Sequence, residues 1–196
     1  MFVADHQRRI RAGQRHEGQP RGDCALGAVL AGGRSSRFGS DKAAALLEGQ
    51  SLLDHALAAL RPHADAVLVF GRAAPGQPLI ADWPAPDLGP MGGIAGALRH
   101  AEAEGFDQLL CISVDCVRLP ADLRGLLEPA PAYLASQPVI GLWPVSTRGA
   151  FEAQLTNSDD RSVRRFGNSI GARAVDSDFV PPNINSVDDL DRLADL

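Results

Sequence analysis

The sequence predicts an α/β protein, a three-layer α/β/α sandwich built around a mostly parallel sheet. Three observations support this prediction. Apolar segments with strand character alternate with helical segments, which is the pattern of a sheet covered on both faces. Residues 25–30 are apolar throughout, as expected of a central strand buried on both sides. The chain has 196 residues, 45% of them hydrophobic, and can bury the core of one domain.

The first 23 residues differ in composition from the rest of the chain. They hold several arginines among Gln, Gly and His, with almost no apolar periodicity. We therefore predict a disordered leader over residues 1–23 and a single domain over residues 24–196. The leader lacks the apolar core of a secretory signal, and its acidic residues argue against a transit peptide.

The ordered elements follow one another closely after the first strand. Helical periodicity over residues 51–60 follows Ser51, a suitable N-cap, and Pro62 closes this segment. Further strands are predicted over residues 66–70, 78–82, 108–114, 139–143 and 172–175. Further helices are predicted over residues 94–101, 120–127, 147–155 and 160–170, and a last one from Ser186. Prolines and glycines over residues 84–90 predict an irregular connection.

Charge and composition exclude several classes of protein. A net charge of −5 argues against a general nucleic-acid or membrane-surface binder, because these usually carry a basic excess. No apolar run approaches the roughly 18 to 20 residues that a membrane span requires. The three cysteines are odd in number and follow no zinc spacing, so we expect reduced thiols in a cytoplasmic protein.

The loop after the first strand has the composition of a phosphate-binding loop. Gly32 and Gly33 allow the backbone to approach a ligand, and the arginines and Lys42 supply positive charge. Lys42 is the only lysine of the chain, so a compact ammonium stands here where Arg serves elsewhere. The alternative is a glycine-rich surface turn between a strand and a helix.

Two carboxylates follow apolar runs, where ligands bind in open sheets of this kind. Asp115 ends the most hydrophobic strand and is the first choice for a Mg²⁺ ligand, because one or two carboxylates usually hold Mg²⁺ against phosphates. Its alternative role is to cap the helix predicted from Pro120. Asp82 ends the segment 78–82, and residues 89–93 form a second glycine-rich segment before a helix, a suitable anion site.

The first loop resembles L-A-G-G-x-x-x-R-[MF]-G-x-D-K, the signature of the nucleotidyltransferases related to molybdenum cofactor guanylyltransferase. The matching residues are Leu30, Ala31, Gly32, Gly33, Arg37, Phe38, Gly39, Asp41 and Lys42. Asp82 precedes the G-P-[LM]-x-G pattern at Gly89 by the family's interval. Asp115 corresponds to the aspartate of C-D-x-P-x-[LI]-P, and the segment that begins at Asn183 matches N-[IV]-N-[TS]-x-[ED]-[ED]-L.

This resemblance implies a Rossmann-like, nucleotide-diphospho-sugar transferase-like fold. It also implies transfer of GMP from GTP to molybdenum-molybdopterin with release of pyrophosphate, in molybdenum cofactor biosynthesis. The implied catalytic residues are Arg37, Lys42 and Asp115. The implied nucleotide-binding residues are Leu30, Ala31, Gly32, Gly33, Lys42, Asp82, Gly89 and Asp115. Asn183 and Asn185 are the implied acceptor-binding residues, and Asp115 is the implied ligand of a Mg²⁺ cofactor.

The implied partners are the two substrates, GTP and molybdenum-molybdopterin. Transient contact with proteins that deliver molybdopterin or mature molybdoenzymes is a further expectation. No nucleic-acid or membrane partner is expected.

The chain departs from the family pattern at several positions. Phe70 stands where characterised guanylyltransferases carry an asparagine that helps to read the base. The choice of base, guanine or cytosine, is therefore open. Val114 and Val117 replace a cysteine and a proline beside Asp115. Two alternatives therefore remain: a related transferase that uses CTP or another phosphorylated acceptor, and a nucleotide-binding relative without catalytic activity.

Overall fold

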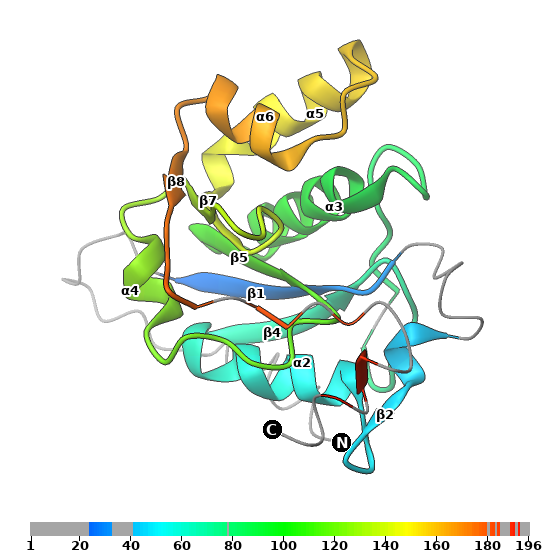
Figure 1. The fold of residues 1–196 in the computed structure, drawn as a ribbon. Coiled ribbons are helices and arrows are strands. Elements are labelled where there is room, and N and C mark those ends of the chain that lie inside the picture. The colour runs from blue at the N-terminus through cyan, green and yellow to red at the C-terminus, as the bar shows by residue number, and fades with distance from the viewer. Residues whose placement is uncertain are drawn as a thin grey trace, which may run out of the picture.

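A six-stranded sheet with the strand order β4-β1-β5-β7-β6-β8 forms the middle layer of the molecule (Figure 1). The computed structural model describes residues 24–32, 41–77, 79–179, 181–182, 184, 189–190 and 192, so the predicted leader lies outside the described residues. The strands are β1 (Ala25–Leu30), β4 (Ala66–Phe70), β5 (Gln108–Ser113), β6 (Ala132–Leu134), β7 (Gly141–Pro144) and β8 (Arg173–Val175). A separate hairpin joins β2 (Leu46–Leu47) to β3 (Gln50–Ser51).

Strand directions confirm the prediction of a mostly parallel sheet. β1 pairs in parallel with β4 on one side and with β5 on the other, and β6 pairs in parallel with β8. β7 lies between β5 and β6 and is antiparallel to both. The reversal at β7 places the turn that precedes it beside the carboxyl end of β5.

Helices cover both faces of the sheet, as the three-layer prediction requires (Figure 1). The helices are α2 (Leu52–Leu60), α3 (Gly89–Glu104), α4 (Leu123–Leu127), α5 (Arg148–Asn157) and α6 (Val163–Ser169). Alternate residues of β1 face opposite layers. Leu26 and Ala28 belong to an apolar cluster that also contains residues of α3, α5 and α6, whereas Val29 belongs to one that contains residues of α2 and α4. Each layer buries apolar surface, which is the main favourable term in folding.

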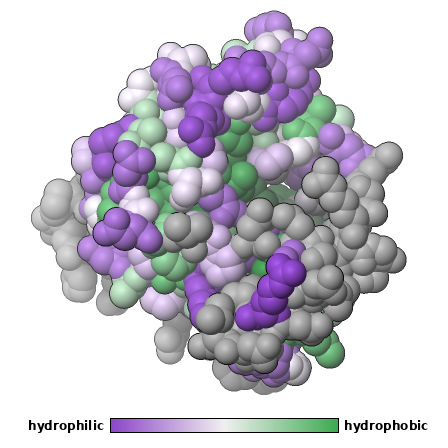
Figure 2. Space-filling model, viewed as in Figure 1, coloured by the Kyte–Doolittle hydropathy of each residue, from purple (hydrophilic) through white to green (hydrophobic). Residues whose placement is uncertain are grey.

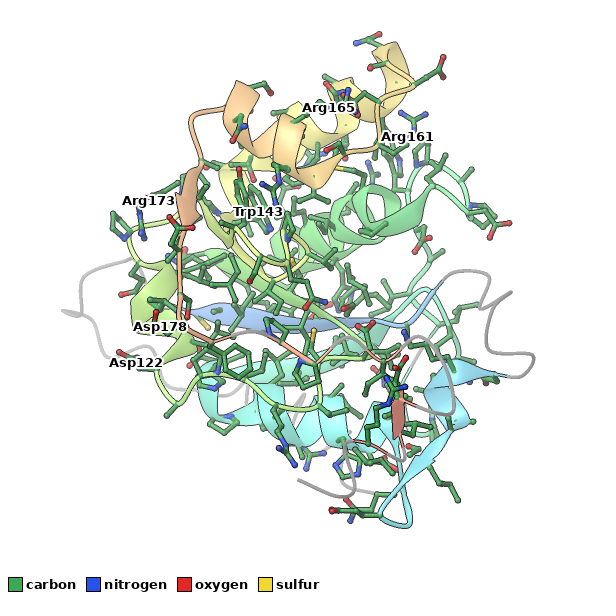
Figure 3. All side chains as sticks on the ribbon, in the orientation of Figure 1. Asp122, Trp143, Arg161, Arg165, Arg173 and Asp178 are labelled. Atoms are coloured by element: carbon green, nitrogen blue, oxygen red, sulfur yellow. The ribbon has the colours of Figure 1, made fainter. Side chains whose placement is uncertain are left out.

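Aromatic packing fixes the antiparallel part of the sheet to α5 and α6. Trp143 of β7 is fully buried in this layer (Figure 3). Its ring stacks on Tyr133 at 6.2 Å between centroids and meets Phe151 edge-on at 5.2 Å. Hydrophilic residues cover the outer side of the same helices (Figure 2). Arg148, at the start of α5, contacts Glu152 at 2.7 Å and Glu102 of α3 at 2.9 Å.

The start of α2 forms as predicted. Ser51 is its N-cap, and the amide of Asp54 donates to Ser51 Oγ at 3.1 Å. Pro62 lies in the short 3-10 helix Arg61–His63 that follows α2. The helix predicted from Ser186 falls mostly outside the described residues, although residues 189–190 and 192 are helical.

The strand predicted over residues 78–82 is wrong, since residues 79–82 form no strand. Only one backbone bond joins this segment to the end of β4, from Gly71 N to Ile80 O at 2.9 Å. On the outer side of β4, the amide of Val69 donates to the side chain of Gln77 at 2.8 Å. A ladder cannot form here because a side chain already occupies the edge of β4.

Two predicted helix starts are also wrong. Gly89–Gly93, expected to precede a helix, forms the first turn of α3 itself, where proline is well tolerated. α4 begins at Leu123 rather than at Pro120, and its N-cap is Asp122, whose Oδ1 accepts from Gly125 N at 3.2 Å. The helix predicted from Pro120 is therefore capped by Asp122, and the alternative role of Asp115 as its cap falls away.

The strand β6 was not predicted. Its three residues follow Pro131 and show too short a pattern to be recognised from the sequence alone. Among the described residues, no helix has both the length and the apolar character needed to cross a membrane.

Candidate active site at the carboxyl edge of the sheet

Lys42 and Asp115 meet at the carboxyl ends of β1 and β5. The ammonium of Lys42 donates to Asp115 Oδ2 at 2.9 Å, and the two side chains are 16% and 14% exposed. Because β1 and β5 are parallel neighbours, the segments that follow them leave the sheet at the same edge. Two residues selected separately from the sequence, 73 positions apart, are thus brought into direct contact.

Asp41, the residue before Lys42, is held by Arg72, which follows β4. Both terminal nitrogens of Arg72 donate to the carboxylate of Asp41, each at 2.7 Å. This pairing lowers the pKa of the Asp41 carboxyl and raises that of the Arg72 guanidinium. Asp41 also caps the 3-10 helix Lys42–Ala44 by accepting from Ala43 N at 3.1 Å. The backbone of Lys42 is therefore fixed at its amino side.

Asp115 lies in a tight turn directly after β5. The amide of Cys116 donates to Ser113 O at 3.0 Å, and Ser113 Oγ donates to Asp115 Oδ1. Burial raises the pKa of the Cys116 thiol to about 12, so this thiol is protonated at neutral pH and is no candidate nucleophile. The carboxylate of Asp115 thus has one oxygen facing Ser113 and the other facing Lys42.

Asp82 lies in a second part of the site, among glycines. A Cβ built on Gly32, Gly71 or Gly93 would lie 3.6, 3.1 or 3.7 Å from Asp82 Oδ1. Gly71 has φ +81°, and a Cβ there would approach Gly32 Cα to 2.7 Å. The absence of side chains allows three backbone segments to close around one carboxylate. The sequence analysis did not identify Gly71, because its role depends on this contact between β1 and β4.

The carboxylate of Asp82 accepts no hydrogen bond from the described residues. Burial raises the pKa of the Asp82 carboxyl, and the charge of Asp87 raises it further. A half-buried acid without a donor is unfavourable for the isolated protein and is typical of a position that meets a ligand.

The backbone groups of the first loop divide between the sheet and the site. The amide of Ala31 donates to Phe70 O at 3.0 Å, and the carbonyl of Leu30 accepts from Val114 N at 3.1 Å. These two groups extend the pairing of β1 with its neighbours. The amide of Gly32 makes no backbone hydrogen bond with the described residues. Among the described residues 30–32, the amide of Gly32 is therefore the one that backbone pairing leaves available to a phosphate.

Gly89 is the first residue of α3, and Phe70 is the last residue of β4. Gly89 begins α3 with φ +65°, and the following turn brings Gly93 against Asp82 and Leu30. Phe70 is 1% exposed and packs edge-on against His100 of α3 at 5.9 Å between ring centroids. A side chain buried in this way cannot contact a base.

Four predicted site residues lie outside the described residues. They are Gly33, Arg37, Asn183 and Asn185. Ile184 is described, and it is fully buried in a cluster that also contains Val117 and Leu47. Since Val117 follows Asp115 by two positions, Ile184 packs on the same side of the molecule as the Lys42–Asp115 pair.

The donor set fits a hard cation that arrives with a phosphate ligand. Asp115 supplies a carboxylate oxygen, and the ammonium of Lys42 already occupies the place of a cation beside it. In the described part of the chain, no group of three His, Cys, Asp or Glu side chains could hold a metal by itself. A metal at Asp115 would therefore complete its ligand shell with phosphate oxygens and water.

Comparison with known proteins shows the family to which the chain belongs. Residues 27–172 match the family model described as MobA-like NTP transferase domain. A molybdenum cofactor guanylyltransferase of Rhizobium johnstonii is 40% identical over 152 residues, which cover 71% of this chain and 73% of that protein. A molybdenum cofactor guanylyltransferase of Acidiphilium cryptum is 36% identical over 186 residues, with 88% and 95% of the two chains covered.

Solved structures support the expected nucleotide-diphospho-sugar transferase-like fold. Molybdopterin-guanine dinucleotide biosynthesis protein A of Archaeoglobus fulgidus superposes with a TM-score of 0.70, at 20% identity over 87% of this chain and 97% of that chain. 2-C-methyl-D-erythritol 4-phosphate cytidylyltransferase of Thermus thermophilus superposes with a TM-score of 0.54, at 18% identity over 89% of this chain and 99% of that chain. At these identities the likeness concerns the fold.

Proposed function

Because the chain belongs to the MobA-like NTP transferase family, we propose that it is a molybdenum cofactor guanylyltransferase. It transfers GMP from GTP to molybdenum-molybdopterin and releases pyrophosphate. The terminal phosphate of the acceptor attacks the α-phosphorus of GTP, so no nucleophilic side chain is needed and the protein contributes positioning and charge.

The observation that carries this proposal is the ion pair between Lys42 and Asp115. A triphosphate brings several negative charges, and each member of the pair has a task in its neutralisation. Lys42 meets phosphate oxygens directly as a point charge. Asp115 holds Mg²⁺, which when bound screens the triphosphate and the departing pyrophosphate. A nucleotide-binding relative without activity would have no need to keep both members in contact.

The other described residues of the site hold the nucleotide. Gly32 offers its amide to a phosphate, and Asp82 accepts a hydrogen bond from the nucleotide and so gains a donor that the described residues do not supply. Arg72 keeps Lys42 in place through Asp41. We assign Arg37 to the phosphates and Asn183 and Asn185 to the acceptor by their match to the family pattern.

The base is the least constrained part of the assignment. Phe70 is buried against α3 and offers no hydrogen bond, so base discrimination must come from other groups. A transferase that uses CTP is therefore the alternative to test. We further propose that the protein acts in the cytoplasm and exchanges molybdopterin through transient contacts with delivery or maturation proteins.

One experiment tests the proposal directly. The purified protein is incubated with each of the four nucleoside triphosphates, Mg²⁺ and molybdenum-loaded molybdopterin, and any dinucleotide is identified by mass spectrometry. We expect the guanine dinucleotide. Formation of the cytosine dinucleotide would show that the protein uses CTP instead of GTP. Absence of product with all four triphosphates would refute the transferase activity.

A further inference from the structure

Gln137 reaches the site from the turn between β6 and β7. Its Nε2 donates to Ser113 Oγ at 3.1 Å and lies 3.5 Å from Cys116 Sγ. Ser113 in turn donates to Asp115 Oδ1. A chain of hydrogen bonds therefore runs from the antiparallel part of the sheet to the carboxylate that also pairs with Lys42.

The direction of these hydrogen bonds follows from the donors and acceptors that each side chain offers. A serine hydroxyl has one hydrogen and two acceptor positions, whereas an ionised carboxylate can only accept. Because the amide of Gln137 donates to the hydroxyl oxygen, the single hydrogen of Ser113 is left for Asp115. Ser113 without Gln137 would be free to turn its hydrogen elsewhere, for instance to Cys116 Sγ at 3.3 Å.

The turn that carries Gln137 is rigidly closed. The amide of Gln137 donates to Leu134 O at 3.1 Å, and its carbonyl accepts from Ile140 N at 2.9 Å. The amide of Leu134 also donates to Ile140 O at 2.9 Å. β7 then pairs with β5 through Cys111 and Gly141, which sets the turn against the end of β5. The side chain of Gln137 thus extends from a fixed backbone.

We propose that Gln137 and Ser113 are positioning residues that orient the carboxylate of Asp115 for its cation. With Oδ1 held by Ser113, Oδ2 is the oxygen that faces the cation, as it now faces Lys42. Neither residue touches the substrates in this role. The inference rests on the proposed function, because the relevant cation is the Mg²⁺ that accompanies the triphosphate. It adds two residues, both outside the family motifs quoted above.

Calorimetry of GTP binding with and without Mg²⁺ isolates this role. The ratio of the two affinities measures how much the metal strengthens binding, whereas damage to the fold would weaken both. We expect Ser113→Ala to reduce this ratio by about tenfold, the effect of losing one hydrogen bond to a charged group. Gln137→Met should reduce it by a similar factor, because Ser113 is then free to turn its hydrogen away from Asp115. Affinity for metal-free GTP and the melting temperature should stay unchanged.

The double variant tests whether the two residues act in one chain. If Gln137 works through Ser113, Ser113→Ala with Gln137→Met should lose no more than Ser113→Ala alone. Ser113→Thr keeps the hydroxyl and should recover most of the ratio. Gln108→Met is the matched control, since Gln108 lies at the other end of β5, where its Oε1 accepts from Arg124 at 3.4 Å. This control should match the unaltered protein.

Several results would overturn the inference. These are additive losses in the double variant, equal losses with and without metal, a silent Gln137→Met, or an unaltered protein whose GTP affinity is independent of Mg²⁺. Failure of the proposed function would appear separately, as absence of dinucleotide from the unaltered protein. The binding measurements do not depend on that product.

Discussion

The two edges of the sheet carry charged groups in different arrangements. At the amino edge, Asp65 Oδ2 accepts from Ala25 N at 2.7 Å and lies 3.7 Å from Arg124, which also contacts Gln108. These groups join the starts of β1, β4 and β5. At the carboxyl edge, Asp82 has no donor among the described residues, and Asp115 is paired with the side chain of Lys42.

This difference is the one expected between charges that stabilise the fold and charges that bind a ligand. Charges at the amino edge are paired with one another and with the backbone of β1, so no ligand is needed to complete them. At the carboxyl edge, Asp82 has no donor among the described residues and Asp115 is paired with one lysine from a loop, so a ligand could add contacts to both. The number of charged residues at an edge is therefore a weaker guide to function than the hydrogen bonds that these residues lack.

The largest expected effect is that of Asp115→Asn. Loss of the carboxylate should lower metal-dependent turnover by roughly a hundredfold to a thousandfold, the size of losing a major electrostatic contact with the transition state. The melting temperature should change little. Asp65→Asn at the amino edge is the matched control and should keep full turnover. Steady-state kinetics of both variants would decide, and equal activities would remove the distinction between the edges.

Lys42 should give the next largest effect. Lys42→Ala removes a charge-assisted contact with phosphate worth roughly 1.5 to 3 kcal/mol, so GTP should bind about ten- to a hundredfold more weakly. Lys42→Arg should recover binding only in part, because the planar guanidinium is wider. Titration calorimetry with GTP measures this. Arg124→Ala, a charge removed from the opposite edge, should leave the affinity unchanged, and an equal loss there would contradict the assignment.

Asp82 should show a trade between stability and binding. Its pKa is raised in the fold, so its ionisation opposes folding as the pH rises through that pKa, and the cost is absent below the ordinary value of 3.8. Asp82→Asn should therefore melt at an equal or higher temperature at pH 7, with the gain vanishing in acid, while GTP binds about tenfold more weakly. Thermal melts at pH 7 and at a pH below 3.8 test this. A lower melting temperature at pH 7 would show that Asp82 is structural.

The smallest effect concerns thiols at the two edges. Cys24, just before β1, is exposed, whereas Cys116 at the carboxyl edge and Cys111 within β5 are buried. Burial raises the pKa of Cys111 and Cys116 to about 12 each, which suppresses the reactive thiolate. Iodoacetamide at pH 8 should modify Cys24 alone in the folded protein and all three in denaturant. Peptide mass spectrometry would detect labelling of Cys116, which would show that this edge opens.

Local pattern predicted the parts of the fold that local forces control. The continuous apolar run of β1 and the cap of α2 need only a few neighbouring residues to be recognised, and both were confirmed. β6 and residues 79–82 were misjudged because a short strand depends on its partners. β6 has β7 and β8 beside it, whereas residues 79–82 meet an edge strand already occupied by Gln77.

The sequence by itself also selected Lys42, Asp82 and Asp115, because charged groups after apolar strands are visible in the chain order. It could not show that Lys42 and Asp115 pair, that Gly71 closes on Gly32, or that Gln137 supports Ser113. These relations join residues 73, 39 and 24 positions apart. The order of strands in the sheet and the single reversal at β7 decided them, since the packing of distant segments sets such contacts and local preference does not.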